Sequence, residues 1–254
     1  MATGHQVHVC SSRDELAKAA AHLFVKSARG AVRVRGRFSV ALAGGSTPRD
    51  LYRVLADDDA LREAVSWHDA HVFWGDERHV PPTHDESNFR MAREVLLDHV
   101  PIPSHQIHRV EAEDPDATRV AVAYEQALRI AFGLEDGGWP SFDLVLLGMG
   151  EDGHTASIFP GSTVLHERTR TVVAPFVERF GSHRITLTPP VFAHAREIAV
   201  LVAGLEKAHT LHDVLEGPLV PDRYPIQCLL DSIGAVTWLV DAAAASTMTP
   251  SSLP

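Results

Sequence analysis

The chain has 254 residues, 45% of them hydrophobic and 22% charged, which is ordinary for a globular protein with a sizeable core. The formal net charge is −10 and no long basic run occurs, which argues against nucleic acid and anionic membranes as partners. The two cysteines, Cys10 and Cys228, form neither a CxxC pair nor a disulfide framework, and the first twenty residues contain no apolar signal core. A cytoplasmic protein is therefore expected.

Strand-like apolar runs alternate with helix-like segments along the chain. Strands are expected at 38–43, 70–74, 142–147, 184–188, 198–203 and 236–240. Helices are expected at 13–28, 48–55, 86–97, 116–132 and 206–215. This alternation predicts a single α/β domain over residues 1–254, with a mostly parallel, Rossmann-like sheet covered by helices on both faces. The small, polar stretch 242–254 is expected to fray.

Ligands of such sheets bind outside the carboxyl ends of the strands, so we expect the functional residues directly after each strand. The first predicted strand ends in Gly44-Gly45-Ser46-Thr47-Pro48. The glycines permit close backbone approach, Ser46 or Thr47 suits a helix cap, and Pro48 suits a first turn. This segment is either an anion site at free N–H groups or simply a capped turn. It is not a P-loop, because no Gly-Lys-Ser/Thr follows.

The predicted strand 70–74 is followed directly by Gly75-Asp76-Glu77-Arg78. Three consecutive charged residues directly after an aromatic strand have two interpretations. They form a solvated turn with a local ion pair, or Arg78 enters the cleft as a cation.

The central segment contains a formal GxGxxG at Gly148, Gly150 and Gly153. A dinucleotide site is disfavoured because this motif comes late in the chain. Pro160 and Gly161 would also end any helix after about two turns. A dinucleotide-binding dehydrogenase nevertheless remains an alternative to be tested by NAD(P) titration.

Asp152-Gly153-His154 within the same segment places an imidazole at a glycine-rich turn beside carboxylates. Most histidines are structural, but imidazole is the natural base near neutral pH. We found no GxSxG elbow, no HExxH and no histidine pair at a recognised metal spacing. Chemistry without a metal or cofactor is therefore expected.

Two later cations complete the candidate site. Arg184 opens the predicted strand 184–188, and Lys207 follows the strand 198–203. Each alone is more typical of a solvated surface, but together near one sheet edge they would hold a phosphate.

Taken in order, these blocks resemble the 6-phosphogluconolactonase family over roughly residues 38–240. The resemblance implies an α/β protein related to glucosamine-6-phosphate deaminases. It also implies hydrolysis of 6-phospho-D-glucono-1,5-lactone to 6-phosphogluconate, the second step of the oxidative pentose phosphate pathway. The substrate would be a small phosphosugar lactone, no cofactor would be needed, and a monomer is expected.

The family's motifs imply a role for several positions of this chain. By this resemblance His154 is the general base, and Gly44, Gly45 and Ser46 line the site. Arg78, Arg184 and Lys207 are implied as substrate-binding cations. We further expect Asp152 to orient the imidazole and Asp76 to lie in the substrate site.

Two other rival functions remain open. A sugar-phosphate isomerase/deaminase shares Asp76 and the Asp152-Gly153-His154 turn. Such enzymes, however, carry Tyr at the position of Arg78 and Glu at the position of Phe159. A non-enzymatic sugar-phosphate sensor would be distinguished by a simple turnover assay.

Overall fold

The computed structural model describes residues 5–249 and is built on a six-stranded sheet in the order β1-β10-β9-β5-β2-β3. Every neighbouring pair in this sheet is parallel, so the predicted mostly parallel α/β sheet is confirmed. The residues of the inner strands β9, β5 and β2 are nearly all buried and mostly apolar, as expected for a parallel sheet that is covered on both faces. The strands are β1 (Gln6–Cys10), β2 (Phe38–Leu42), β3 (Ala70–Trp74), β5 (Leu144–Gly148), β9 (Glu197–Val202) and β10 (Ala235–Asp241).

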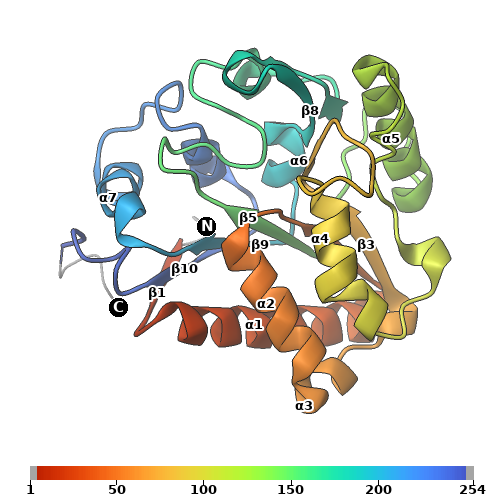
Figure 1. The fold of residues 1–254 in the computed structure, drawn as a ribbon, viewed down its shortest axis with the longest axis horizontal. Helices are drawn as coiled ribbons and strands as arrows, with labels where there is room; N and C mark the ends of the chain where they lie inside the picture. Colours follow the sequence, from red (N-terminus) through yellow and green to blue (C-terminus); the bar gives the residue numbers. More distant parts are fainter. Residues whose placement is uncertain (1–4, 250–254) are drawn as a thin grey trace.

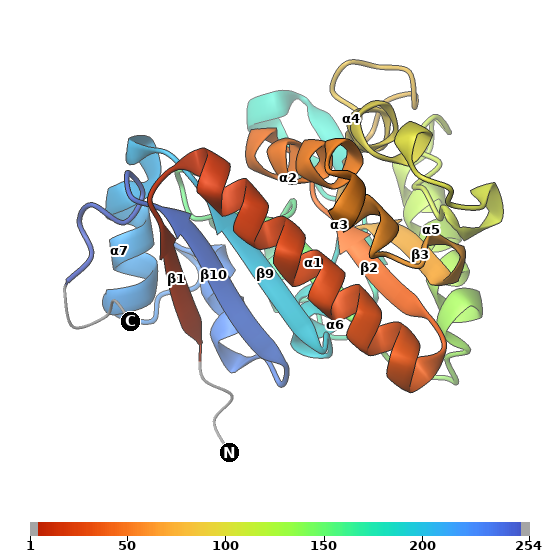
Figure 2. The same cartoon turned by 90° about the horizontal axis from the view of Figure 1, so that it is seen from below.

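Helices lie on both sides of this sheet. Helices α1 and α2 run below it in Figure 1, and the view from below in Figure 2 shows α1 crossing β10 and β9. Helices α6 and α7 lie on the opposite side. The helices are α1 (Arg13–Arg35), α2 (Ser46–Asp57), α3 (Asp59–Glu63), α4 (Asn88–Val95), α5 (Ala117–Phe132), α6 (Pro189–Ala193) and α7 (Ala208–Glu216). Short 3₁₀ segments are η1 (Trp67–Asp69), η2 (Leu97–His99), η3 (Ser104–Gln106), η4 (Thr163–His166), η5 (Glu178–Phe180), η6 (Leu205–Lys207) and η7 (Pro225–Asp231).

Helix α1 continues well beyond its predicted end at residue 28. Its start follows ordinary capping rules, because the Ser12 hydroxyl accepts a hydrogen bond from the N–H of Glu15. Its end is set by Gly36, which adopts a left-handed φ of 70° and donates its N–H to the carbonyl of Val32. The arginine-rich last turns are anchored to the rest of the fold, since Ala31 is buried and Nε of Arg35 donates to Oδ1 of Asp143 at 2.7 Å.

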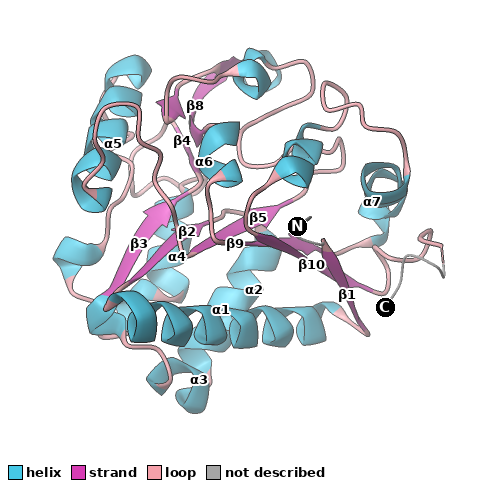
Figure 3. Ribbon diagram, turned by 180° about the vertical axis from the view of Figure 1, so that it is seen from behind, coloured by secondary structure: helices cyan, strands magenta, loops and turns pink. Residues whose placement is uncertain are grey.

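A second, antiparallel sheet stands above the main one (Figures 1 and 3). It contains β4 (Asp76–Arg78), β8 (Ser182–Leu187) and β6 (Val172–Val173), with β7 (Phe176–Val177) paired to β8. We expected the 184–188 strand beside the parallel strands, and this placement was wrong. Strand β4 leaves β3 after only Gly75, whose carbonyl accepts the N–H of Leu187, so β8 pairs with this continuation of β3.

Two further segments differ from expectation. Strand β1 was missed, because its short alternation of histidine and valine carries little apolar signal at a sheet edge. The stretch expected to fray from residue 242 is packed instead, since Ala244 and Met248 are buried and Thr247 donates its hydroxyl to the carbonyl of Ala208. The remainder of that predicted tail, residues 250–254, lies outside the described residues.

Two buried tyrosines bind the backbone where β2 and β3 end. The Tyr52 hydroxyl donates to the carbonyl of Ala43 at 2.8 Å and accepts the N–H of the same residue at 3.0 Å. Tyr124 makes the same two bonds to Trp74, at 3.0 and 2.8 Å. Burial raises the pKa of both phenols, so each remains a neutral donor. These bonds hold the strand ends at which the polar turns begin.

We predict that Tyr52→Phe lowers the free energy of unfolding by about 1–3 kcal/mol, because it leaves a buried N–H and a buried carbonyl unpaired. Urea denaturation of both proteins measures the difference. Tyr224→Phe is the matched control, since the Tyr224 hydroxyl donates to Asp213, whose side chain is 44% exposed and regains water. Equal losses in the two variants would contradict this role of Tyr52.

Candidate functional site

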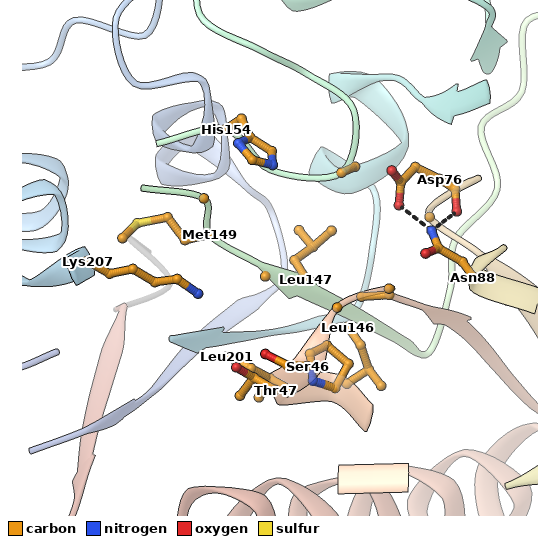
Figure 4. A pocket seen from close by; sticks show the side chains of 18 of the residues that line it. Ser46, Thr47, Asp76, Asn88, Leu146, Leu147, Met149, His154, Leu201 and Lys207 are labelled. Carbon is orange, nitrogen blue, oxygen red and sulfur yellow. Dashed lines mark hydrogen bonds between the residues drawn. The ribbon is translucent and has the colours of Figure 1, made fainter. Parts of the chain in front are cut away.

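A pocket opens at the carboxyl ends of β2, β3, β5 and β9 (Figure 4). It is bordered by the Gly44–Pro48 turn, by the start of β4, by the turn after β5 and by η6. Most of the predicted site residues border it. Those that line it are Gly44, Gly45, Ser46, Asp76, Arg78, His154 and Lys207.

The turn at the start of α2 is shaped by two glycines. Gly45 has a φ of 98°, and a Cβ on Gly44 would lie 1.9 Å from Oδ1 of Asn88. Gly45 is the N-cap and no side chain caps the helix, so the prediction that Ser46 or Thr47 would do so was wrong. Both lie in the first helical turn, where the backbone N–H groups have no partner within the helix. These groups are open to a ligand in the pocket.

Asp76 presents a fixed carboxylate to the pocket. Its Oδ1 accepts a hydrogen bond from Nδ2 of Asn88 at 3.2 Å, and its Oδ2 accepts one from the hydroxyl of Ser157 at 2.6 Å. Figure 4 shows Asp76 and Asn88 side by side. Asn88 also lines the pocket, yet we predicted no role for it, because its position depends on how α4 packs against β4.

Glu77, the neighbour of Asp76, points away from the pocket. Its carboxylate is 2% exposed and accepts the backbone N–H groups of Arg78, Asn88 and Phe89. The hydroxyl of Ser87 also donates to it. Burial raises the pKa of Glu77, although the backbone donors oppose this effect. Glu77 therefore holds the first turn of α4 against β4.

Arg78 and Arg184 lie opposite each other in the β4–β8 pair. Arg78 lines the pocket and donates from Nη1 to the carbonyl of Glu86 at 2.5 Å. Arg184 is buried beside it on β8, is not among the residues that line the pocket, and donates to the hydroxyl of Ser182 at 2.6 Å. Burial, followed by the charge of Arg78, lowers the pKa of Arg184. Two adjacent guanidinium groups favour an anion nearby.

Lys207 lines the pocket from η6. Burial lowers the pKa of its ammonium, partly opposed by the carboxylate of Glu206. Within residues 5–249 this ammonium forms no ion pair or hydrogen bond with a side chain. Lys207 therefore reaches the pocket from η6, whereas Arg184 lies on β8 and is not among the residues that line it.

His154 is oriented by Asp152. Nδ1 of His154 lies 2.5 Å from Oδ1 of Asp152, and the same oxygen accepts the backbone N–H of His154 at 3.1 Å. Burial by itself raises the pKa of Asp152, but the bonds from His154 and Arg179 outweigh it and the pKa is lowered. An ionised carboxylate only accepts hydrogen bonds, so Nδ1 carries the proton. The other ring nitrogen, Nε2, has no partner among the described residues, and the ring borders the pocket.

The middle glycine of the formal GxGxxG, Gly150, makes room for this histidine. A Cβ on Gly150 would lie 2.0 Å from Nδ1 of His154, so the imidazole occupies the space that a side chain would need. Turns fill residues 149–162, and the next helical segment is η4. A dinucleotide fingerprint requires a helix start directly after the glycines, so the dinucleotide hypothesis loses its structural basis.

Two general features of the described chain bear on function. Over residues 5–249, no group of three or more His, Cys, Asp or Glu side chains is placed to hold a metal ion. Among the helices of that same stretch, none is both long and apolar enough to cross a membrane.

The chain is similar to proteins from several organisms. The profile described as "Glucosamine-6-phosphate isomerases/6-phosphogluconolactonase" matches residues 11–238. A 6-phosphogluconolactonase of Synechocystis sp. is 40% identical over 220 residues, which covers 87% of this chain and 88% of that protein. One of Mycobacterium tuberculosis is 37% identical over 250 residues, covering 94% and 97%.

Solved structures show the same likeness. The 6-phosphogluconolactonase from Trypanosoma cruzi superposes with a TM-score of 0.85 at 35% identity, and the match covers 98% of each chain. Profile, sequence and structure agree over nearly the whole length. The chain therefore belongs to the family of glucosamine-6-phosphate isomerases and 6-phosphogluconolactonases.

Proposed function

We propose that this chain hydrolyses 6-phospho-D-glucono-1,5-lactone to 6-phosphogluconate, using a water molecule activated by His154. The observation that carries the proposal is the pairing of Nδ1 of His154 with Asp152, which leaves Nε2 as the acceptor at a pocket lined by cations. The name shared by the most similar relatives supports the choice of substrate.

In the proposed reaction Nε2 of His154 takes a proton from water as the water oxygen bonds to C1 of the lactone. The bond between C1 and the ring oxygen then breaks, and the proton passes from Nε2 to that oxygen. The ionised Asp152 stabilises the imidazolium between these two steps. The ester carbonyl is electrophilic enough for water attack, so the mechanism assigns no role to a metal.

The other residues at the pocket each bind a different part of the substrate. Arg78 and the N–H groups of the Gly44–Ser46 turn are the donors for negative charge on the carbonyl oxygen. The fixed carboxylate of Asp76 accepts hydrogen bonds from sugar hydroxyls. Lys207 binds the phosphate directly, and Arg184 adds positive charge beside Arg78.

Phe159 argues against the isomerase/deaminase alternative. Its ring centroid lies 4.6 Å from that of His154, at the position where such enzymes place a glutamate. An apolar ring thus stands where a glutamate would assist ring opening, and the carboxylate that does lie beside the imidazole, that of Asp152, contacts its Nδ1.

We predict that His154→Gln lowers kcat by about 10²–10⁴-fold, the usual contribution of a positioned base. In the parent, kcat/KM falls on the acid side as the imidazole takes up a proton, and this limb disappears from the residual activity of the variant. Binding of 6-phosphogluconate, measured by calorimetry, changes little because the cations are untouched. His22→Gln, an exposed histidine on α1, is the matched control.

The substrate phosphate also titrates near pH 6, so an acid limb alone is not diagnostic. If His154→Gln keeps both the parental kcat and the parental acid limb, His154 is not the base and the mechanism is wrong.

We predict that Lys207→Met mainly raises KM for the phosphorylated lactone, by roughly 10- to 100-fold, because one hydrogen bond to a charged group contributes about 1.5–3 kcal/mol. Arg184→Met changes KM in the same direction but less, since Arg184 is not among the residues that line the pocket and acts from beside Arg78. Unphosphorylated gluconolactone is a poor substrate whose kinetics neither change affects, and Lys26→Met on the exposed side of α1 is the control. Equal sensitivity towards both lactones would assign these cations to the fold or to the chemistry.

We also predict that hydrolysis survives exhaustive treatment with EDTA, because the mechanism uses no metal. The assay generates the lactone in situ and follows acid release. Loss of activity that zinc or another divalent ion restores would contradict the proposed mechanism.

A further inference from the structure

The oxygen of Asp152 that does not face His154 is bound by an arginine outside the family motifs. Nη1 of Arg179, in η5, lies 2.7 Å from Oδ2 of Asp152, while Oδ1 receives both bonds from His154. Across residues 5–249 no other side chain donates to Oδ2. The carboxylate is thus held from two opposite sides.

Arg179 itself lies against two aromatic rings, which pack edge to face on each other with centroids 5.8 Å apart. Its Cζ lies 4.3 Å from the ring centroid of Phe159 and 4.6 Å from that of Phe180. The Phe159 ring also packs on the imidazole of His154, at 4.6 Å between centroids. Arg179, Asp152, His154 and Phe159 therefore form a closed ring of contacts, in which each group limits the movement of the next.

The same stack continues towards the cations of the second sheet. The Cζ of Arg184 lies 4.7 Å from the centroid of Phe180, on the ring that also contacts Arg179. Segment η5 thus connects the His154–Asp152 pair to the β4–β8 strands that carry Arg78 and Arg184. Its side chains are exposed, so this arrangement is not a consequence of packing in the main core.

The charge of Arg179 acts on the imidazole through Asp152. A guanidinium here stabilises the ionised carboxylate, which keeps the proton of His154 on Nδ1. It also opposes the positive charge of an imidazolium, so its removal favours protonation of His154. Other charged groups on the elements around this turn include Glu151, Glu178, Glu206, Lys207, Asp222 and Arg223. None of them bonds to Asp152 or His154 among the described residues, and all are unchanged when Arg179 alone is substituted.

We propose that Arg179 is a positioning residue for the His154–Asp152 pair: from the far side of the carboxylate it orients the imidazole and restricts its protonation. This role rests on the proposed function, since it concerns the base of the same hydrolysis. It extends the site to η5, none of whose residues is among those that line the pocket.

The test compares Arg179→Met with Arg223→Met. Arg223 is an exposed arginine that also stacks on an aromatic ring, at 4.9 Å from the centroid of Tyr224, but it does not bond to Asp152. Both variants lose one positive charge near the site, so any difference between them reports the contact with Asp152. Thermal unfolding confirms that each variant is folded, which an exposed position favours.

For Arg179→Met we expect kcat to fall roughly 10-fold with KM changed less than about twofold, since orientation and not ground-state binding is lost. The acid limb of kcat/KM should move up by about 0.3–1 pH unit, as removal of a nearby partly solvated charge predicts. Arg179→Lys retains the charge without the stacked guanidinium, so it should keep the parental acid limb with an intermediate kcat. A purely structural role would leave the limb where it is.

An NMR titration of the His154 ring nitrogens, assigned by comparison with His154→Gln, provides a readout that needs no lactone. An upward shift of this titration in Arg179→Met that exceeds the shift in Arg223→Met supports the proposal. Equal shifts in the two variants overturn it, even if the parent is a lactonase that depends on His154. If the parent hydrolyses no lactone, the proposed function fails, and the titration still decides whether Arg179 controls His154.

Discussion

Parallel pairing of β9, β5, β2 and β3 is the constraint on which the site depends, because it brings the carboxyl ends of four strands to one edge of the sheet. Each of these strands is followed by a glycine within two residues of its last position, at Gly204, Gly150, Gly44 and Gly75. The glycines let the chain turn steeply while the polar residues behind them face the same space. The pocket is therefore a product of the sheet, and its chemistry comes from the four turns.

Charge is distributed unevenly over this pocket. The protein carries a net charge of −10, yet the carboxylates near the site are already engaged: Asp76 by Asn88 and Ser157, and Asp152 by His154 and Arg179. The ammonium of Lys207 has no such partner among the residues described. An anionic ligand thus meets available positive charge, while acidic side chains elsewhere leave the protein negative overall.

The parts of the structure with local signals were predictable from the sequence. Buried strands such as β2 and β5 are recognisable in the sequence as short apolar runs. Glycine-rich segments after these runs indicate the turns that lead into a helix or a polar cluster. The positions of Asp76 and His154 at the pocket follow from that rule, because carboxyl ends of parallel strands share an edge.

Features that depend on tertiary partners were not predictable in this way. A strand pattern at residues 184–188 does not reveal that its partner is β4, so the burial of Arg184 beside Arg78 was missed. Arg179 carries no motif at all, since its bond to Asp152 crosses 27 positions and depends on how η5 folds back. The predicted capping of α2 was wrong for a related reason. The helix begins one residue earlier than a Ser46 cap requires, so Gly45 is the N-cap and Ser46 is already the first helical residue.

Gly150 has a consequence for how this protein tolerates change. It does not adopt a positive φ, so the backbone conformation does not itself require glycine, and the obstacles nearest to a methyl group are the ring of His154 and, at 2.9 Å, Oδ1 of Asp152. A substitution of Gly150 that displaces this ring would impair the site even though every acidic, basic and cationic residue of the site is still present. The mutational tolerance of position 150 should therefore be as narrow as that of position 154, for reasons of space alone.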